Sequence, residues 1–186
     1  MNLSPELWSE GLEYAAYRAQ VSRNQETFDE VYDSPAFTAG DLAFLRQLPQ
    51  LKILCLGEDW CADVYQTLPT WARVVDELSG WSFRVFPRDQ HLELMERFLW
   101  RGYAQRIPVY AFYDQRNVLQ LWWSGRSRVA QAELDGYLDG RKFADLNEGE
   151  KNGARRVLND GYRREFRRAN FEEILMLLGS FFHAGR

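Results

Sequence analysis

The residues of this chain best suited to covalent chemistry are two cysteines, Cys55 and Cys61. Cys55 lies within the apolar run 51–56, and Cys61 follows that run after the short turn 57–60, where a helix is expected to begin. Backbone amides at a helix start lack partners, and the helix macrodipole is positive there. Both effects favour the thiolate, which is the nucleophilic form of cysteine. We therefore expect Cys61 to be the catalytic residue, if the chain has one.

The elements that must position Cys61 alternate between strands and helices. Short apolar runs predict strands at 51–56, 81–86, 109–113 and 118–123, and helical patterns lie at 61–78, 90–101 and 127–138. The resulting α/β order is β-α-β-α-β-β-α. Such alternation implies parallel pairing of the first strands, and the turn 114–117 adds an antiparallel hairpin. We predict a central mixed sheet.

Helical patterns flank this core on both sides. The N-terminal segment 1–50 opens with the cap Ser4 and with Pro5, and the C-terminal segment 141–186 carries helical patterns at 145–159 and 162–182. No repeat or long linker separates these parts. We predict a single domain over 1–186, with a core at 51–140 and helical extensions on either side.

Composition narrows the classes of function. The net charge is −4, and acids are interleaved in the basic stretch 155–168, so a solvated helix face is favoured over a nucleic-acid site. The acidic N-terminus differs from a signal peptide, and no apolar run is long enough to span a bilayer. We therefore expect a cytoplasmic protein without membrane contact, in which thiols are reduced.

Other chemistries find little support in the sequence. His91 and His183 are isolated and no phosphate-cradling glycine loop is present, so we expect neither a metal nor a cofactor. An apolar stripe runs along the last helix, within 171–182. It is expected to pack on the domain, with an oligomer contact as the alternative, so the predicted state is a monomer or a weak homodimer.

Several motifs together resemble the thioredoxin superfamily. The segment 58–64, Glu-Asp-Trp-Cys-Ala-Asp-Val, is similar to the family's active-site segment, in which Trp-Cys-x-x-Cys opens a helix. Pro69 matches a helix-kinking proline, the segment 106–108 matches the loop with a cis-proline, and Gly125 also matches. The likeness covers 51–138 and implies the thioredoxin fold. The helical preface resembles that of an uncharacterised bacterial thioredoxin-like group with a single active-site cysteine.

One departure from the family limits the chemistry that the resemblance implies. Val64 stands where the family has its second, resolving cysteine. A dithiol enzyme depends on that second thiol to release its mixed disulfide. The remaining possibility is monothiol exchange, in which Cys61 forms a mixed disulfide with a protein or small thiol and an outside thiol releases it.

The resemblance also gives supporting roles to residues near Cys61. Trp60 is expected to shield the sulfur or simply to pack. The cis-Pro108 of the family leaves the backbone of the preceding residue, here Ile107, free to pair with an extended substrate. Cys55 occupies the position of a buried family acid. It is either an ordinary core residue, which we favour, or an unusual second thiol.

Charged side chains near Cys61 have opposing expected effects. Glu58, Asp59 and Asp63 would raise its pKa, against the effect of the helix start. Asp63 also fits a helix-stabilising acid in a first turn, and we favour that interpretation. Arg106 is the candidate compensating cation, although an exposed loop arginine is the simpler assignment.

Two hypotheses of function follow. In the first, the chain is a monothiol redox protein that reduces or deglutathionylates partners through Cys61, and the thiol pKa is low. In the second, the chain is a redox-silent scaffold that binds a peptide or partner in the cleft beside Pro108. The sequence favours the first hypothesis slightly.

Overall fold

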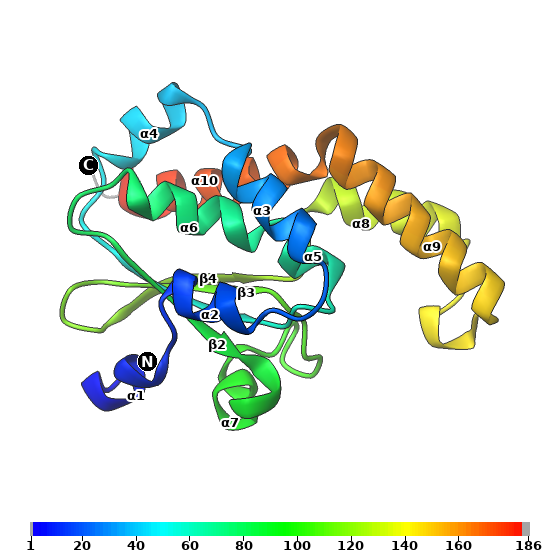
Figure 1. Ribbon diagram of the computed structural model, residues 1–186, viewed down its shortest axis with the longest axis horizontal. Helices are drawn as coiled ribbons and strands as arrows, with labels where there is room; N and C mark the ends of the chain where they lie inside the picture. The colour runs from blue at the N-terminus through cyan, green and yellow to red at the C-terminus, as the bar shows by residue number, and fades with distance from the viewer. Residues whose placement is uncertain (1, 184–186) are drawn as a thin grey trace.

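A central sheet carries helices on both faces in the computed structural model, which describes residues 2–183 (Figure 1). The strands are β1 (Lys52–Gly57), β2 (Ser82–Pro87), β3 (Val109–Tyr113) and β4 (Leu119–Ser124), in the order β2-β1-β3-β4. β1 pairs parallel with β2 and antiparallel with β3, and β3 and β4 form an antiparallel hairpin. This confirms the predicted mixed sheet and the α/β thioredoxin fold.

In the N-terminal half, the first helix begins at Pro5 and another begins directly after Cys61, as predicted. The helices of this half are α1 (Pro5–Glu10), α2 (Tyr14–Gln20), α3 (Gln25–Asp33), α4 (Ala39–Leu45), α5 (Ala62–Tyr65) and α6 (Leu68–Asp76). α1 ends at Glu10, and α2 follows as a separate helix, because Gly11 is extended and Leu12 pairs with Val85. A Cβ at Gly11 would lie 2.4 Å from the Phe86 ring, so only glycine permits this approach.

The second half departs more from the expected pattern. The region predicted as a helix at 90–101 contains only short pieces, η1 (Arg88–Gln90), α7 (Leu92–Met95) and η2 (Glu96–Phe98). The helical path ends at Leu99, whose ψ of 119° is extended, and Arg101 and Gly102 then turn the chain with positive φ angles of 52° and 78°. The remaining elements are α8 (Arg128–Leu138), η3 (Phe143–Asp145), α9 (Glu148–Gly161), the π-helical segment η4 (Tyr162–Phe166) and α10 (Arg167–His183).

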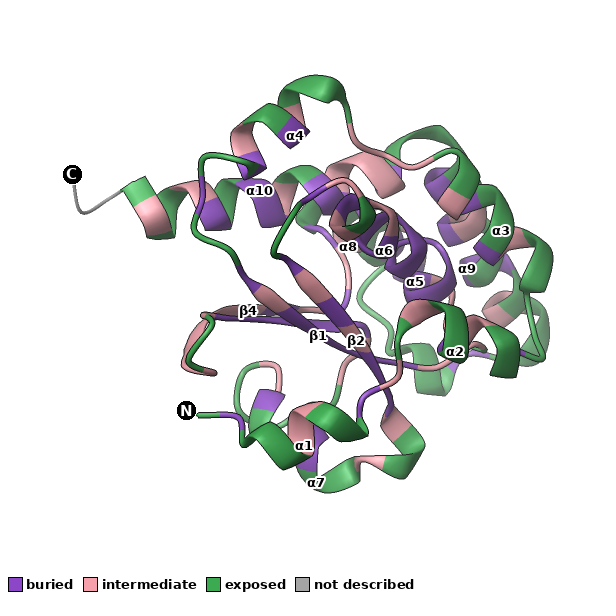
Figure 2. Cartoon of the chain, turned by 60° about the vertical axis from the view of Figure 1, so that its left-hand side comes forward, coloured by how far each residue is buried: buried purple, intermediate pink, exposed green. Residues whose placement is uncertain are grey.

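Two apolar layers enclose the sheet (Figure 2). On one face, Leu54 and Leu56 of β1 pack with residues of α7 and η2 and with partly buried side chains of α1. On the other face, Ile53 and Cys55 pack with residues of α3, α4, α6 and α10. Both faces of β1 are therefore buried, as the continuous apolar run predicted.

The last helix of the predicted core, α8, packs on the C-terminal extension and not on the sheet. Its buried residues form a separate apolar cluster with the C-terminal extension, made of Ala130, Leu134, Leu138, Leu146, Ala154, Leu158, Tyr162 and Phe166. α8 and α9 lie side by side and extend past the sheet in Figure 1. α10 packs on the sheet with Phe171, Ile174 and Leu178 buried at 2%, 1% and 0% exposure. The C-terminal extension is thus part of the sheet's apolar cover.

Candidate functional site

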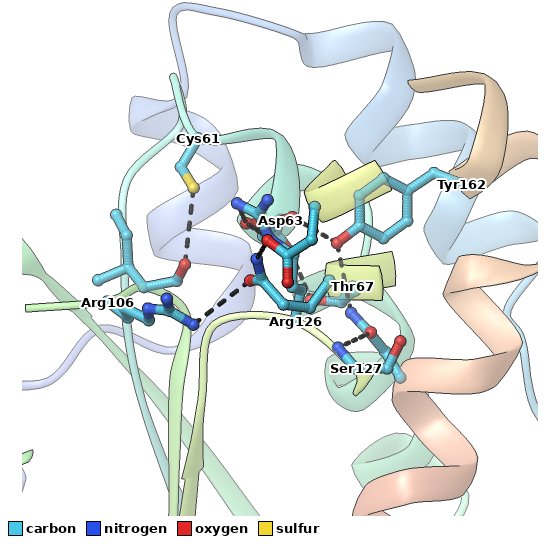
Figure 3. A network of polar contacts seen from close by, with 11 residues as sticks. Cys61, Asp63, Thr67, Arg106, Arg126, Ser127 and Tyr162 are labelled. Carbon is cyan, nitrogen blue, oxygen red and sulfur yellow. Dashed lines mark hydrogen bonds and ion pairs between the residues drawn. The ribbon is translucent and has the colours of Figure 1, made fainter. Parts of the chain in front are cut away.

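Cys61 caps the first turn of α5 and faces the proline loop (Figure 3). Its Sγ donates to the carbonyl oxygen of Ile107 across 3.7 Å, and the Ile107–Pro108 peptide bond is cis. Gly125, with φ at 84°, donates its N–H to the Pro108 carbonyl at 2.8 Å. The structure therefore brings together Cys61, Ile107, Pro108 and Gly125, which the sequence motifs grouped.

The thiol of Cys61 is protonated at neutral pH. Burial raises its pKa to about 12, and the Asp63 carboxylate adds to the rise. Backbone hydrogen bonds from Val64 and Asp63, together with the charge of Arg126, act in the opposite direction but are weaker. The pKa is therefore raised, against the low value expected under the first hypothesis, because burial of the sulfur outweighs the backbone N–H groups at the start of α5.

Asp63 forms a buried ion pair beneath the cysteine. Arg126 donates to one carboxylate oxygen, with Nη2 at 2.6 Å and Nε at 3.0 Å. The hydroxyl of Tyr162 donates to the other oxygen at 2.5 Å. The carboxylate raises the pKa of Arg126 despite the opposing effect of burial. Asp63 is 3% exposed and ion-paired, so the assignment as only a helix-stabilising acid of the first turn was incomplete.

The C-terminal extension supplies part of this network. Tyr162 begins the π-helical segment η4, and such segments are often found at functional sites. Asn170 of α10 donates to the Tyr162 hydroxyl at 3.4 Å and accepts from the backbone N–H of Ser127 at 2.6 Å. The pKa of Tyr162 is raised by burial and by Asp63, so its hydroxyl remains a donor. Sequence reasoning missed Arg126, Tyr162 and Asn170.

The two other acids near Cys61 in sequence have structural partners. Asp59 accepts from the backbone N–H groups of Ser22 and Arg23, at 2.9 and 3.0 Å, and so fixes the loop between α2 and α3. Glu58 accepts from the backbone N–H of Asp89 at 2.7 Å. Asp63 is therefore the acid with the largest effect on the Cys61 pKa.

The position where the family has its resolving cysteine, Val64, and the second cysteine of this chain, Cys55, are both buried. Val64 is fully buried and packs closely on Gly57, where an added Cβ would lie 2.9 Å from its Cγ1. Cys55 is fully buried in β1, and burial raises its pKa well above the usual range. Its place in the core agrees with the simpler assignment made from the sequence.

A cleft of about 490 Å³ opens beside Cys61. Trp60, which is 45% exposed, lies at this cleft with the Arg88 guanidinium 5.5 Å from its ring centroid. Leu138 and Phe143 also line the cleft, so the C-terminal part of the chain forms one wall and leaves the cleft open. We call this space the Cys61 cleft.

Arg106 lines the Cys61 cleft but is not the main compensating cation. Its guanidinium carbon lies 3.5 Å from the Trp100 ring centroid, and its Nη1 donates to Gln131 at 3.4 Å. Arg126, which is ion-paired with Asp63, lowers the Cys61 pKa instead. The signal for Arg126 was weak, because only its position next to Gly125 linked it to the motif.

Metal clusters and membrane-spanning helices are both absent from the described residues 2–183. In this range no three His, Cys, Asp or Glu side chains gather as a metal site would require. None of the helices there combines the length and apolar character that a membrane span needs.

Comparison with known proteins identifies the fold and leaves the activity open. A thioredoxin family model matches residues 11–138. A crystal structure of a protein of unknown function from Pseudomonas aeruginosa matches with a TM-score of 0.66 and 16% identity, covering 97% of this chain and 99% of the other. An HIV epitope-scaffold matches with a TM-score of 0.64 and 14% identity, covering 94% and 96%. No curated protein matches the chain.

Proposed function

Because the chain belongs to the thioredoxin family, we propose that its Cys61 cleft binds an extended segment of a partner protein and that Cys61 is a slow, protonated thiol there. The observation that carries this proposal is the environment of the Cys61 sulfur. Cys61 Sγ is held against the Ile107 carbonyl at 3.7 Å, above a carboxylate, and its pKa is raised to about 12. A fast thiol enzyme needs the reverse environment.

The burial of the second thiol also supports a binding role. Within residues 2–183 the other sulfhydryl is that of Cys55, which is fully buried in β1. Val64 occupies the position where a resolving thiol would be expected. A mixed disulfide on Cys61 would therefore need an outside thiol for its release.

The cleft has features that suit an extended chain. Trp60 offers an exposed ring at its mouth, and such rings are frequent anchors of binding energy. An extended segment that lies beside the proline loop can pair its backbone with that of the protein. Arg88 and Arg106 add positive charge to the walls.

Monothiol exchange is the second candidate, because Cys61 still lines an open cleft and the backbone N–H groups of Asp63 and Val64 act to lower its pKa. In that reaction the Cys61 thiolate attacks a partner disulfide, an S–S bond forms to the nearer sulfur, and the other sulfur leaves as a thiolate. An outside thiol then attacks the mixed disulfide and restores Cys61. This candidate requires that a bound partner lower the Cys61 pKa.

Alkylation of Cys61 against pH separates the two candidates. In a Cys55→Ala variant, we expect iodoacetamide to react at pH 7 roughly 10²-fold more slowly than with free cysteine, because so little thiolate is present and its higher intrinsic nucleophilicity offsets this only in part. The rate should rise about tenfold per pH unit up to at least pH 9.5. Mass spectrometry of the modified peptide gives the rate, and the unfolded variant serves as the control. A plateau below pH 8 would favour monothiol exchange.

Binding of peptides selected from a random library tests the cleft directly. We expect Cys61→Ala to keep the dissociation constant within about twofold, because the sulfur contributes little contact area. Trp60→Ala should weaken binding at least about tenfold, since an anchoring ring is lost. Fluorescence polarisation gives both values.

Two outcomes would contradict the binding proposal. One is that Cys61→Ala abolishes peptide binding while Trp60→Ala does not. The other is that the unaltered protein rapidly turns over a glutathionylated peptide while the Cys61→Ser variant does not, because such turnover would make the thiol a working nucleophile.

A further inference from the structure

A second pocket of about 490 Å³ lies next to the Cys61 cleft, on the other side of Arg106. Its walls come from the end of β4, from the loop that follows η2 and from α8. Among the residues that line it are Trp100, Arg101, Arg106, Trp122, Trp123 and Ser124. We call it the tryptophan–arginine pocket. The role inferred for it does not depend on the function proposed for the Cys61 cleft.

Two arginines of this pocket gather around one ring. The guanidinium carbons of Arg101 and Arg106 lie 4.2 and 3.5 Å from the ring centroid of Trp100. Among residues 2–183, neither guanidinium has a carboxylate within ion-pair distance. Burial and the neighbouring charges of Arg126 and Arg101 lower the pKa of Arg106. The cluster is therefore short of negative charge.

The acids of the pocket are occupied by other groups. Glu173 accepts from the indole N–H of Trp123 at 2.9 Å and from the backbone N–H of Arg128 at 2.8 Å. Asp135 accepts from the side chain of Gln131 at 2.7 Å. These neutral donors do not cancel the charge of either carboxylate, but Glu173 also pairs with Arg128 and Asp63 pairs with Arg126. Arg101 and Arg106 therefore share one remaining acid of the pocket, Asp135, and carry the excess positive charge.

Two further observations mark the pocket as a receptor for a ligand. Arg101 has a φ of 52°, a left-handed conformation that costs free energy for a residue with a side chain, and strain of this kind gathers at binding sites. Ser124 lines the pocket, and its hydroxyl oxygen has no hydrogen-bond partner in the described part of the chain, but this oxygen is itself inaccessible. A ligand would satisfy it only after the Ser124 side chain turns and brings the hydroxyl to the pocket surface.

We propose that the tryptophan–arginine pocket binds a small organic anion whose carboxylate or phosphate bridges Arg101 and Arg106. Guanidinium groups match the planar fork of such oxyanions, and the charge-assisted hydrogen bonds are strong. The partly buried Trp122 offers an apolar surface to a flat body on the same ligand, since the Trp100 ring is covered by the two arginines and Trp123 is buried. The pocket volume suits a molecule of drug-like size. The ligand class is a flat ring that carries one oxyanion.

Isothermal titration calorimetry with four probes tests this assignment. Adenosine monophosphate and 1-naphthoate each combine a ring with an oxyanion, whereas adenosine lacks the anion and inorganic phosphate lacks the ring. We expect at least one of the first two probes to bind about tenfold or more tightly than both of the others. The stronger of the two identifies phosphate or carboxylate as the preferred group.

A variant of the exposed Arg101 and a remote control variant test whether the probe binds in this pocket. Arg101→Gln should weaken binding of the tighter probe at least about tenfold, since a bidentate ionic contact is lost. Arg163→Gln, which removes an exposed arginine on the remote π-helical segment, should leave binding unchanged. Equal losses in the two variants, equal affinity for phosphate alone, or no binding of any probe would overturn the proposal. None of these readouts depends on Cys61, so the result is independent of the function of the Cys61 cleft.

Discussion

Replacement of Asp63 with alanine is expected to lower the free energy of unfolding by about 3–5 kcal/mol, because Arg126 would remain buried and charged without its carboxylate. Tyr162 would also lose the acceptor of its hydroxyl, which now lies 2.5 Å away. Denaturation with urea measures the change. A cost below about 1 kcal/mol would show that the ion pair contributes little.

A double variant tests whether the cost comes from the unpaired charge. Asp63→Leu combined with Arg126→Met removes both charges, and it should be less destabilising than the two single changes added together. The same Asp63→Ala protein should have a lower Cys61 pKa, since the carboxylate that raises it is gone. Alkylation by iodoacetamide would therefore become faster at pH 8. Glu26→Ala, an exposed acid in the first turn of α3, serves as the surface control.

Phe171→Ala in α10 is the second large effect, with an expected loss of about 3–5 kcal/mol. The Phe171 ring lies 4.9 Å from that of Trp71 and is 2% exposed, so its removal leaves a cavity between α10 and α6. Phe181→Ala on the same helix is the matched control, because that ring is 48% exposed and its loss should cost less than about 1 kcal/mol. Equal stability of the two variants would mean that α10 is not part of the core.

The sheet and the position of Cys61 could be predicted because their signals are local. A continuous apolar run such as 51–56 predicts a strand buried on both faces, and the structure confirms it. The cysteine after a Trp and the proline at 108 each belong to a short segment, so the resemblance of these segments to the thioredoxin superfamily placed them. Sequence patterns of this kind indicate which element a residue belongs to.

The electrostatics of the site could not be predicted in the same way. Asp63 and Tyr162 are far apart along the chain, and no periodic pattern joins them. The raised pKa of Cys61 depends on how many neighbours exclude water from its sulfur, which is a property of the assembled fold. Likewise, the pattern of α8 shows that it has an apolar face, but not that α9 covers that face in place of the sheet.

α9, the π-helical segment and α10 follow one another directly and connect the sheet to the projecting α8–α9 pair. Residues 148–183 are helical throughout, with the π-helical segment that begins at Tyr162 between the two arms. One arm is fastened to the sheet through α10, and the other projects with α8, whose end reaches the wall of the Cys61 cleft at Leu138. Helices bend at π-helical segments, so a change of angle between the two arms would act at Tyr162. The Asp63–Tyr162 contact and the α8–α9 wall of the cleft therefore meet at the same bend.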